Sequence, residues 1–291
     1  MSILVDATTK VIVQGMTGRS GTFYADQAIR YGTDIVGGVR PGKGGTRHLG
    51  LPVFDNVAEA VKETGANASL VMVPAHHAAD AMVDAIEAGI AVIVCVTERV
   101  PQHDMSRVMS ALEDSNTVLI GPNSQGILTP DGCKIGVMPT RDATPGSVGI
   151  VSRSASLTSE ILAQLSNAQL GQSTTIGVGG DTIHGLGFVG SLERFREDDQ
   201  TRAVVLIGEI GGREEEDAAA YLQSAPYGKP VIALVVGRGA PNERRMGHAG
   251  TLSIFGAETA AQKIDLLEKA GVLIAKNADD VAEQVKTALA G

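Results

Sequence analysis

The sequence has few cysteines, few aromatic residues and no long apolar segment. Its 291 residues include only two cysteines, Cys95 and Cys133, too few for a disulfide framework, and this indicates a reducing compartment. No uninterrupted apolar run approaches the ~20 residues that a membrane-spanning helix needs, and residues 1–6 do not resemble the start of a secretory signal. We therefore expect no membrane association and a cytoplasmic protein, or a mitochondrial-matrix protein whose presequence has been removed.

An excess of positive charge is also missing. The formal net charge is -9, which argues against a nucleic-acid-binding surface because phosphate backbones are held by excess Lys and Arg. The histidines and cysteines show no metal-ligand spacing, so no metal site is expected. What the chain has in quantity is glycine, with 36 residues, and apolar side chains, at 43%. Such a composition favours a globular protein with many tight turns and phosphate-binding loops.

Short β-branched runs alternate with helix-periodic stretches along the whole chain. In the first part, strands are expected at 11–13, 70–73, 91–96 and 118–120, and helices at 21–31, 56–64, 77–89 and 103–114. A second series has strands at 148–151, 174–178, 203–207, 231–236 and 272–274, and a last helix at 278–290. Runs that are apolar on both faces are typical of parallel strands covered by helices. The fold class is therefore α/β, with two consecutive doubly wound domains at 1–126 and 147–291, joined by a proline-containing connector at 127–146.

A glycine-rich loop follows the first expected strand. Residues 15–21 read Gly-Met-Thr-Gly-Arg-Ser-Gly and lead into a helix, whose free N–H groups and positive dipole end can bind phosphate. The glycine spacing is not that of the dinucleotide fingerprint. A simple tight strand-to-helix turn is the alternative.

The loop at residues 39–45, which follows the strand next in the chain after 11–13, is basic. An NAD site would place an acidic residue there, whereas residues 39–45 supply Arg40 and Lys43. Cations at this position indicate a phosphorylated ribose, as in CoA or NADP. Two solvated basic residues in a loop are the alternative.

In the second domain, three more strands end in polar or glycine-rich turns, at 152–157, 177–181 and 208–212. The last of them places Glu209 at the carboxyl end of a strand, where α/β sheets bind their ligands. Farther along, His248 stands between glycines, so its imidazole is accessible for attack on a phosphoryl group, and the nearby Arg244 and Arg245 are expected to steady the charge. The alternatives are a turn-capping glutamate and a surface histidine.

Taken together, these motifs resemble those of the α subunits of the succinyl-CoA synthetase (succinate–CoA ligase) family over essentially the entire chain. The motifs are Gly15-x-Thr17-Gly18-x-x-Gly21-Thr22-Phe23, Gly37-Gly38-Val39-x-Pro41-Gly42-Lys43-Gly44-Gly45, Gly121-Pro122-Asn123, Val148-Gly149-Ile150-Val151-Ser152-Arg153-Ser154, Gly208-Glu209-Ile210-Gly211-Gly212 and Arg245-Met246-Gly247-His248-Ala249-Gly250.

The resemblance implies an N-terminal Rossmann-like CoA-binding domain followed by a flavodoxin-like domain that bears a phosphohistidine loop. His248 and Glu209 would be catalytic, with Glu209 accepting a hydrogen bond from one ring nitrogen and leaving the other free. CoA would be held by Thr17, Gly18, Arg19, Ser20, Lys43, Val96, Thr97 and Glu98. The substrate and phosphate positions would be Ser154, Ala155, Ser156, Ser159 and Asn123.

The implied reaction has three steps and needs a second chain. A nucleoside triphosphate phosphorylates His248, the phosphoryl group passes to a carboxylate, and the CoA thiol displaces phosphate to give the thioester. The sequence has no Gly-x-x-x-x-Gly-Lys-Ser/Thr loop. By resemblance, ATP or GTP and Mg²⁺ lie on an ATP-grasp β subunit, in an αβ or α2β2 assembly.

The sequence departs from the family where the acid is expected to bind. Ser159 stands where the family has Tyr, Ser124-Gln125 replaces Cys-Pro, and residues 182–184 replace Pro-Ile-Pro. We therefore expect the acid to be succinate or a related dicarboxylate, and a substituted one such as malate is the alternative. Two further hypotheses are an NADP-dependent oxidoreductase, which the glycine spacing disfavours, and a non-catalytic CoA-binding regulator, which leaves Glu209 and His248 without a role.

Overall fold

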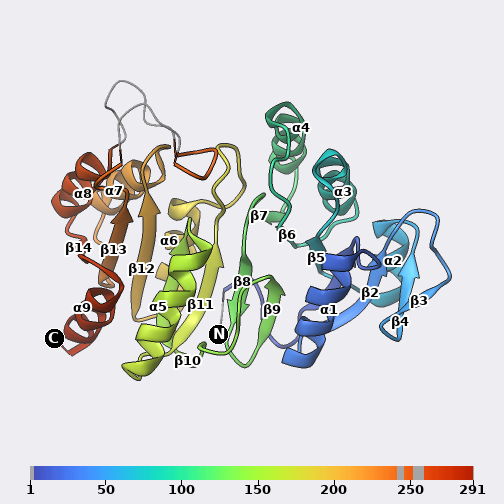
Figure 1. Ribbon diagram of the computed structural model, residues 1–291, viewed down its shortest axis with the longest axis horizontal. Helices are drawn as coiled ribbons and strands as arrows, with labels where there is room; N and C mark the ends of the chain where they lie inside the picture. The colour runs from blue at the N-terminus through green and yellow to red at the C-terminus, as the bar shows by residue number, and fades with distance from the viewer. Residues whose placement is uncertain (1–2, 241–245, 252–258, 291) are drawn as a thin grey trace. The chain divides into compact units, whose positions relative to one another are not determined.

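The structure, a computed structural model, describes residues 3–240, 246–251 and 259–290. The chain divides into two compact units. The N-terminal unit consists of residues 4–138 and 183–185, and the C-terminal unit of residues 139–182 and 186 onward together with Ile3. Each unit is built around its own sheet (Figure 1).

In the N-terminal unit the strand order is β3-β4-β2-β1-β5-β6-β7, and every pair is parallel except the antiparallel pair β3 and β4. Leaving aside the edge strand β3, this is the 3-2-1-4-5-6 order of the Rossmann fold. The order reverses between β1 and β5. The strands are β1 (Lys10–Gln14), β2 (Asp34–Val39), β3 (Arg47–His48), β4 (Leu51–Phe54), β5 (Ala68–Val71), β6 (Val92–Cys95) and β7 (Val118–Ile120).

The central strands of this sheet are buried on both faces because helices cover them. Ile12 and Ile93 are fully buried and pack in one cluster with Met82. The covering helices are α1 (Arg19–Tyr31), α2 (Val57–Thr64), α3 (Ala75–Glu87) and α4 (Gln102–Glu113). Each lies within two residues of an expected helix. Gly32 and Gly65 end α1 and α2 in the left-handed conformation, which glycine adopts without a steric penalty.

The segment after residue 126 differs from the expected connector. It forms an antiparallel hairpin of β8 (Gly126–Thr129) and β9 (Cys133–Gly136) within the N-terminal unit. Both strands are buried, and the unit boundary lies between residues 138 and 139. Proline and the Asp131-Gly132 pair indicated a loop, and they do form the hairpin turn. The apolar residues on either side, such as Ile127 and Ile135, instead bury themselves as strands.

In the C-terminal unit the strands run in the order β14-β13-β12-β10-β11, all parallel. Numbered along the unit, this is the 2-1-3-4-5 order of flavodoxin, which reverses between β10 and β12. The strands are β10 (Pro145–Ser152), β11 (Gln172–Gly177), β12 (Ala203–Glu209), β13 (Val231–Val236) and β14 (Leu273–Ile274). The predicted fold class, with Rossmann-like and flavodoxin-like domains, is confirmed.

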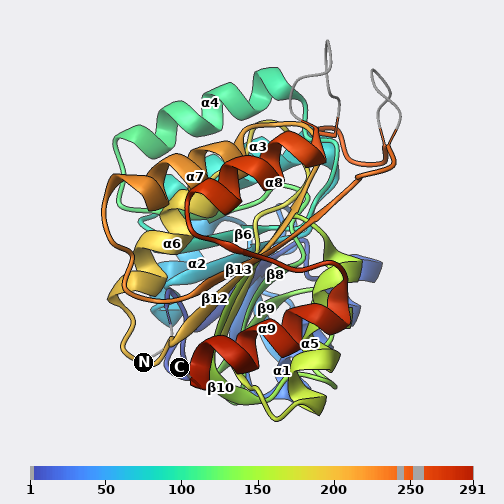
Figure 2. The ribbon, with the colours of Figure 1, turned by 90° about the vertical axis from the view of Figure 1, so that its left-hand side faces the viewer.

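Helices lie on both faces of this sheet as well. Figure 2 shows α6, α7 and α8 on one side of the strands and α5 and α9 on the other. Their bounds are α5 (Ala155–Asn167), α6 (Phe188–Glu197), α7 (Glu214–Ser224), α8 (Ala260–Lys269) and α9 (Ala278–Ala290). No helix of the described residues has both the length and the apolar character to cross a membrane.

Candidate functional site

The site of the C-terminal unit lies where the strand order reverses. β10 ends at Ser152, which is paired in register with Ile207, and β12 continues two residues farther to Glu209. The backbone N–H of Arg153 donates to the carbonyl of Ile207, so the turn after β10 stays next to β12. The carboxyl ends of these strands bring together the polar side chains that the sequence scatters over about 100 positions.

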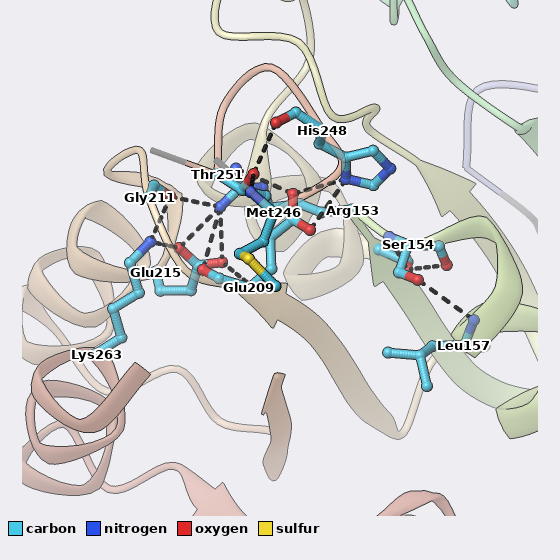
Figure 3. Close-up of polar contacts among 11 residues, drawn as sticks. Arg153, Ser154, Leu157, Glu209, Gly211, Glu215, Met246, His248, Thr251 and Lys263 are labelled. Carbon is cyan, nitrogen blue, oxygen red and sulfur yellow. Dashed lines mark hydrogen bonds and ion pairs between the residues drawn. The ribbon is translucent and has the colours of Figure 1, made fainter. Parts of the chain in front are cut away.

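His248 and Glu209 are in direct contact. Nδ1 of His248 lies 2.9 Å from Oε1 and 3.0 Å from Oε2 of Glu209 (Figure 3). The imidazole is part-exposed, at 35% for the side chain, whereas the carboxylate is buried at 9%. Since a carboxylate can only accept, Nδ1 carries the proton when the ring is neutral, and Nε2 keeps its lone pair.

The loop of His248 is fixed by its own backbone and by Gly180. Thr251 donates through Oγ1 to the carbonyl of His248 at 2.7 Å, and Gly250 N–H donates to the carbonyl of Gly180 at 3.1 Å. A Cβ at position 180 would lie 2.3 Å from Cγ of His248. Only glycine leaves room for the ring there. Arg244 and Arg245, which we expected to steady charge nearby, lie outside the described residues.

The pKa of His248 is raised above its ordinary value. The main cause is the hydrogen bond that the ring donates to Glu209, supported by the negative charge of the same carboxylate and of Asp181. Partial burial of the ring and the positive charge of Arg153 oppose the shift. The net effect favours a proton on the ring.

Behind Glu209 lies a buried ionic cluster that the sequence analysis missed. Arg153 Nη2 is 3.3 Å from Oε1 of Glu209, and its Nη1 is 3.2 Å from Oε1 of Glu215 and donates to the Gly211 carbonyl at 2.8 Å. Lys263 contacts the same Glu215 carboxylate. Glu215 lies in the acidic first turn of α7, where residues 214–217 suggest a solvated helix start. Only the tertiary structure shows that Glu215 turns inward.

The expected substrate and phosphate positions lie at the start of α5. Ser154 is the N-cap, and its side chain accepts a hydrogen bond from the Leu157 N–H (Figure 3). Ala155 and Ser156 are exposed in the first turn. Ser159 is half-buried one turn farther on, and its hydroxyl donates to the carbonyl of Ala155 at 3.3 Å. Ser154 directly follows Arg153, so this helix end is tied to the Glu209 site through the chain.

In the N-terminal unit, a pocket of about 670 Å³ opens at the other reversal of strand order. That size suits a nucleotide-sized ligand. Gly18 and Arg40 line one part, and Met72 and Val73 an apolar part; the complete lining is Gln14, Gly15, Gly18, Val39, Arg40, Pro41, Asp55, Met72, Val73, Pro74, His77, Asp80, Ala81 and Asp84.

Of the eight residues expected to hold CoA, Gly18 lines this pocket, while Thr17, Lys43 and Thr97 contact residues that line it. Thr17 accepts from Arg40 Nη1 at 2.7 Å, and Lys43 N–H donates to Asp55 at 3.1 Å. Thr97 donates to the carbonyl of Val73 at 2.7 Å.

The other expected CoA residues lie on neighbouring segments. Arg19 and Ser20 are exposed in the first turn of α1, and Val96 and Glu98 follow β6. Asn123, expected to belong with the Ser154 group, is in the N-terminal unit, where its N–H donates to the carbonyl of Thr97. Arg40 was noted as basic but not assigned to the site, although it lines the pocket.

Comparisons with known proteins cover both units. A family model described as a CoA binding domain matches residues 6–99, and one described as CoA-ligase matches residues 151–273. A protein of Archaeoglobus fulgidus named succinate–CoA ligase (ADP-forming) subunit alpha 2 is 50% identical over 98% of this chain and 99% of its own length. The corresponding alpha subunit of Aquifex aeolicus is 49% identical over 98% of this chain and 94% of its own.

Among solved structures, an ATP citrate lyase of Methanosaeta concilii, in complex with (3S)-citryl-CoA, superimposes with a TM-score of 0.88. The identity is 22%, and the match covers 98% of this chain. The chain spans 50% of the length of that protein. At this identity the likeness shows the fold.

Proposed function

Because the chain belongs to the family of succinate–CoA ligase α subunits, we propose that it binds CoA in its N-terminal unit and carries a phosphoryl group on His248 in its C-terminal unit. One observation supports the phosphohistidine above all others. Glu209 occupies Nδ1 of His248 with both carboxylate oxygens, which directs the reactive lone pair to Nε2.

In the proposed first step, Nε2 attacks the terminal phosphorus of a nucleoside triphosphate. The N–P bond forms as the bond to the nucleoside diphosphate oxygen breaks. Glu209 keeps Nδ1 protonated and compensates the positive charge that develops on the ring. An acid carboxylate then takes the phosphoryl group, and His248 returns to its starting state. Storing the phosphoryl group on the ring lets one site serve two substrates in turn.

The residues of the N-terminal pocket fit CoA. Gly18 is the N-cap of α1 and offers no side-chain cap, so the first N–H groups of the helix are open to a phosphate. Arg40 adds a cation on the same lining, and Met72 and Val73 offer an apolar surface to a base. The acidic residues Asp55, Asp80 and Asp84 would repel phosphates. The phosphates of CoA are therefore proposed to lie at the end of the pocket formed by Gly18 and Arg40. CoA supplies the thiol that receives the acyl group.

We also propose an ATP-grasp β subunit as the partner, in an αβ or α2β2 assembly, which binds ATP or GTP with Mg²⁺. The acid is proposed to be succinate or a related dicarboxylate. The names of the relatives support a ligase that acts with a second subunit.

His248→Ala tests the function directly. The complex of this chain with its β subunit, incubated with γ-labelled ATP and Mg²⁺, is expected to label the wild-type chain with an acid-labile, base-stable phosphate, and the Ala variant not at all. His103→Ala is the matched control, because His103 is an exposed histidine on α4 of the other unit. Labelling of the His248 variant at the wild-type rate would refute the assignment. Labelling of this chain without the β subunit would refute the proposal that the nucleotide binds on that subunit.

A further inference from the structure

Two charged side chains that the proposed reaction does not use are completely buried behind the site. The side chain of Lys263, on α8, is 0% exposed, and that of Glu215, on α7, is 1% exposed. Lysine and glutamate are almost never fully buried unless they are paired, because desolvating a charge is costly. Their burial at this place calls for a role.

Their contacts lead step by step to His248. Lys263 Nζ contacts Glu215 and donates to the Gly211 carbonyl at 2.8 Å (Figure 3). The Glu215 carboxylate also accepts from the Glu209 N–H at 2.9 Å and from Arg153 Nη1 at 3.2 Å. Arg153 is therefore shared between two carboxylates, Glu215 and Glu209.

The backbone around the cluster is closely packed. Gly208 lies so close to Glu215 that a Cβ there would be 2.5 Å from Oε1, and a Cβ on Gly211 would be 2.2 Å from the Gly250 carbonyl. Gly250 belongs to the loop of His248. The end of β12 and the turn after it therefore contact both the cluster and the histidine loop.

We propose that Lys263 and Glu215 are positioning residues that divide the charge of Arg153 between Glu215 and Glu209, and so control protonation of His248. This inference rests on the proposed function for its meaning in the reaction, because a protonated Nε2 cannot accept a phosphoryl group. Its physical content is independent of the reaction.

The sign of each substitution follows from the charges around the ring. Facing His248 are Glu209 from β12, Arg153 from the turn after β10 and Asp181 from the loop after β11. Without the Lys263 charge, Glu215 draws Arg153 more strongly, Glu209 is less neutralised, and the pKa of His248 rises.

The opposite change has the opposite effect. Without the Glu215 charge, Arg153 turns its full charge to Glu209, and the pKa of His248 falls. Glu214 and Glu216 of α7 also act on the cluster, through Arg153 and Lys263 respectively, and are left unchanged.

The test compares Lys263→Met, Glu215→Gln and the double variant in the complex with the β subunit. His248 is titrated by NMR of the labelled imidazole, and the rate of phosphohistidine formation is measured against pH. We expect the pKa and the rising limb of the rate to move up in Lys263→Met and down in Glu215→Gln, with the double variant in between. At a pH below the wild-type limb, the rate in Lys263→Met should fall about three- to tenfold.

Two controls separate positioning from simple stabilisation. Lys269→Met removes the same charge from the same helix at an exposed ion pair with Asp265, and should leave the titration unchanged. Lys263→Arg keeps the charge, so its rate of phosphohistidine formation should rise over the same pH range as in the wild type. If Lys263→Met does not fold, the effect of Lys263 is read as the difference between Glu215→Gln and the double variant.

Shifts in the same direction for Lys263→Met and Glu215→Gln, or no shift in either, would overturn the inference. The NMR titration gives this result even if His248 takes up no phosphate. If the wild-type complex takes up no phosphate label, the proposed function is refuted, whereas the positioning role is not.

Discussion

At the scale of single residues, the site depends on how closely three groups pack. The Glu209 carboxylate holds one edge of the His248 ring, and the backbone of Gly180 lies where any larger residue would strike the ring. The ring is thus fixed by a charged hydrogen bond on one side and by contact with the backbone on another. Fixed geometry of this kind is what a nucleophile needs when the reacting atoms must be held about 3 to 3.5 Å apart.

Gly180→Ala should disable phosphorylation without removing any functional group. The new Cβ would lie 2.3 Å from Cγ of His248, so the ring must leave its position. We expect the rate of phosphohistidine formation to fall about a hundredfold, the size reported for misplacements near 1 Å. CoA binding, measured by calorimetry, should not change. Gly239→Ala, in open space on the same unit, is the control, and equal losses in both variants would contradict the packing argument.

Glu209→Gln should change the pH dependence as well as the rate. The carboxylate raises the pKa of His248 above its ordinary value, and in the wild type the rate of phosphorylation should rise as the ring loses its proton around this raised pKa. An amide can still accept from Nδ1 but carries no charge, and the rising limb should move to lower pH. The plateau should fall about 10- to 100-fold because the ring loses its charged partner. The measurement is the phosphorylation rate of the complex against pH. If the rate rises over the same pH range in the wild type and in the variant, Glu209 does not control the protonation of His248.

At the scale of elements, α5 is tied to the site because its N-cap directly follows Arg153. Its N-cap Ser154 already satisfies the Leu157 N–H, while Ala155 and Ser156 leave the rest of the first turn open. The following turn carries Ser159, whose short side chain stands where the family has a phenol. The start of this helix therefore combines a positive dipole end with small side chains, which suits an anionic substrate.

Ser159→Tyr tests whether this turn selects the acid. A phenol fills space and leaves less room beside the helix, so we expect the variant to favour unsubstituted succinate over a hydroxylated succinate such as malate. A site that hydrogen-bonds an added hydroxyl rejects the analogue that lacks it, because its polar groups are left unpaired. The measurement is kcat/KM for both acids. If the ratio is the same in the wild type and in the variant, Ser159 does not contribute to specificity.

Elements with a strong local pattern could be predicted from the sequence, and those that depend on tertiary contacts could not. The apolar runs at β6 and β13 and the periodic stretch of α9 were placed within one residue or exactly. The hairpin of β8 and β9 was missed because its strands are four residues long and surround a turn motif. The two-residue strand β3 gave no signal at all.

For the site, the contact between Glu209 and His248 was expected from family motifs, whereas the ionic cluster was not. Lys263 stands in an ordinary polar helix sequence, between Gln262 and Ile264. Nothing local distinguishes a lysine that points into the protein from one that points into solvent. Its burial follows from the packing of α8 against α7, which brings it to Glu215.

At the scale of the whole molecule, two sheets of different strand order each have one candidate site where the order reverses. The N-terminal reversal, between β1 and β5, opens into the pocket, and the C-terminal reversal, between β10 and β12, holds His248 and Glu209. The two proposed half-reactions thus draw on separate sets of residues.

Substitutions in the basic loop should therefore affect thioester formation alone. Arg40→Ala and Lys43→Ala each remove a cation proposed to contact a phosphate, and we expect the KM for CoA to rise about tenfold or more. If the basic loop contacts the 3′-phosphate, the wild type and the variants should have equally high KM values for CoA that lacks this phosphate. Lys62→Ala, an exposed lysine of the same unit, is the control. A loss in His248 phosphorylation as large as the loss in CoA use would indicate misfolding instead.

The course of the chain between the two units limits how the protein can be taken apart. Ile3 belongs to the C-terminal unit, where its N–H reaches Thr174, although the next 135 residues belong to the other unit. Residues 183–185 return to the N-terminal unit, where Gly185 N–H donates to the Gly121 carbonyl. Neither unit is therefore one continuous stretch of sequence. A gene cut at a single position yields two fragments that each lack a piece of their own fold, so the CoA-binding and histidine-bearing halves can be exchanged between relatives only as composite grafts.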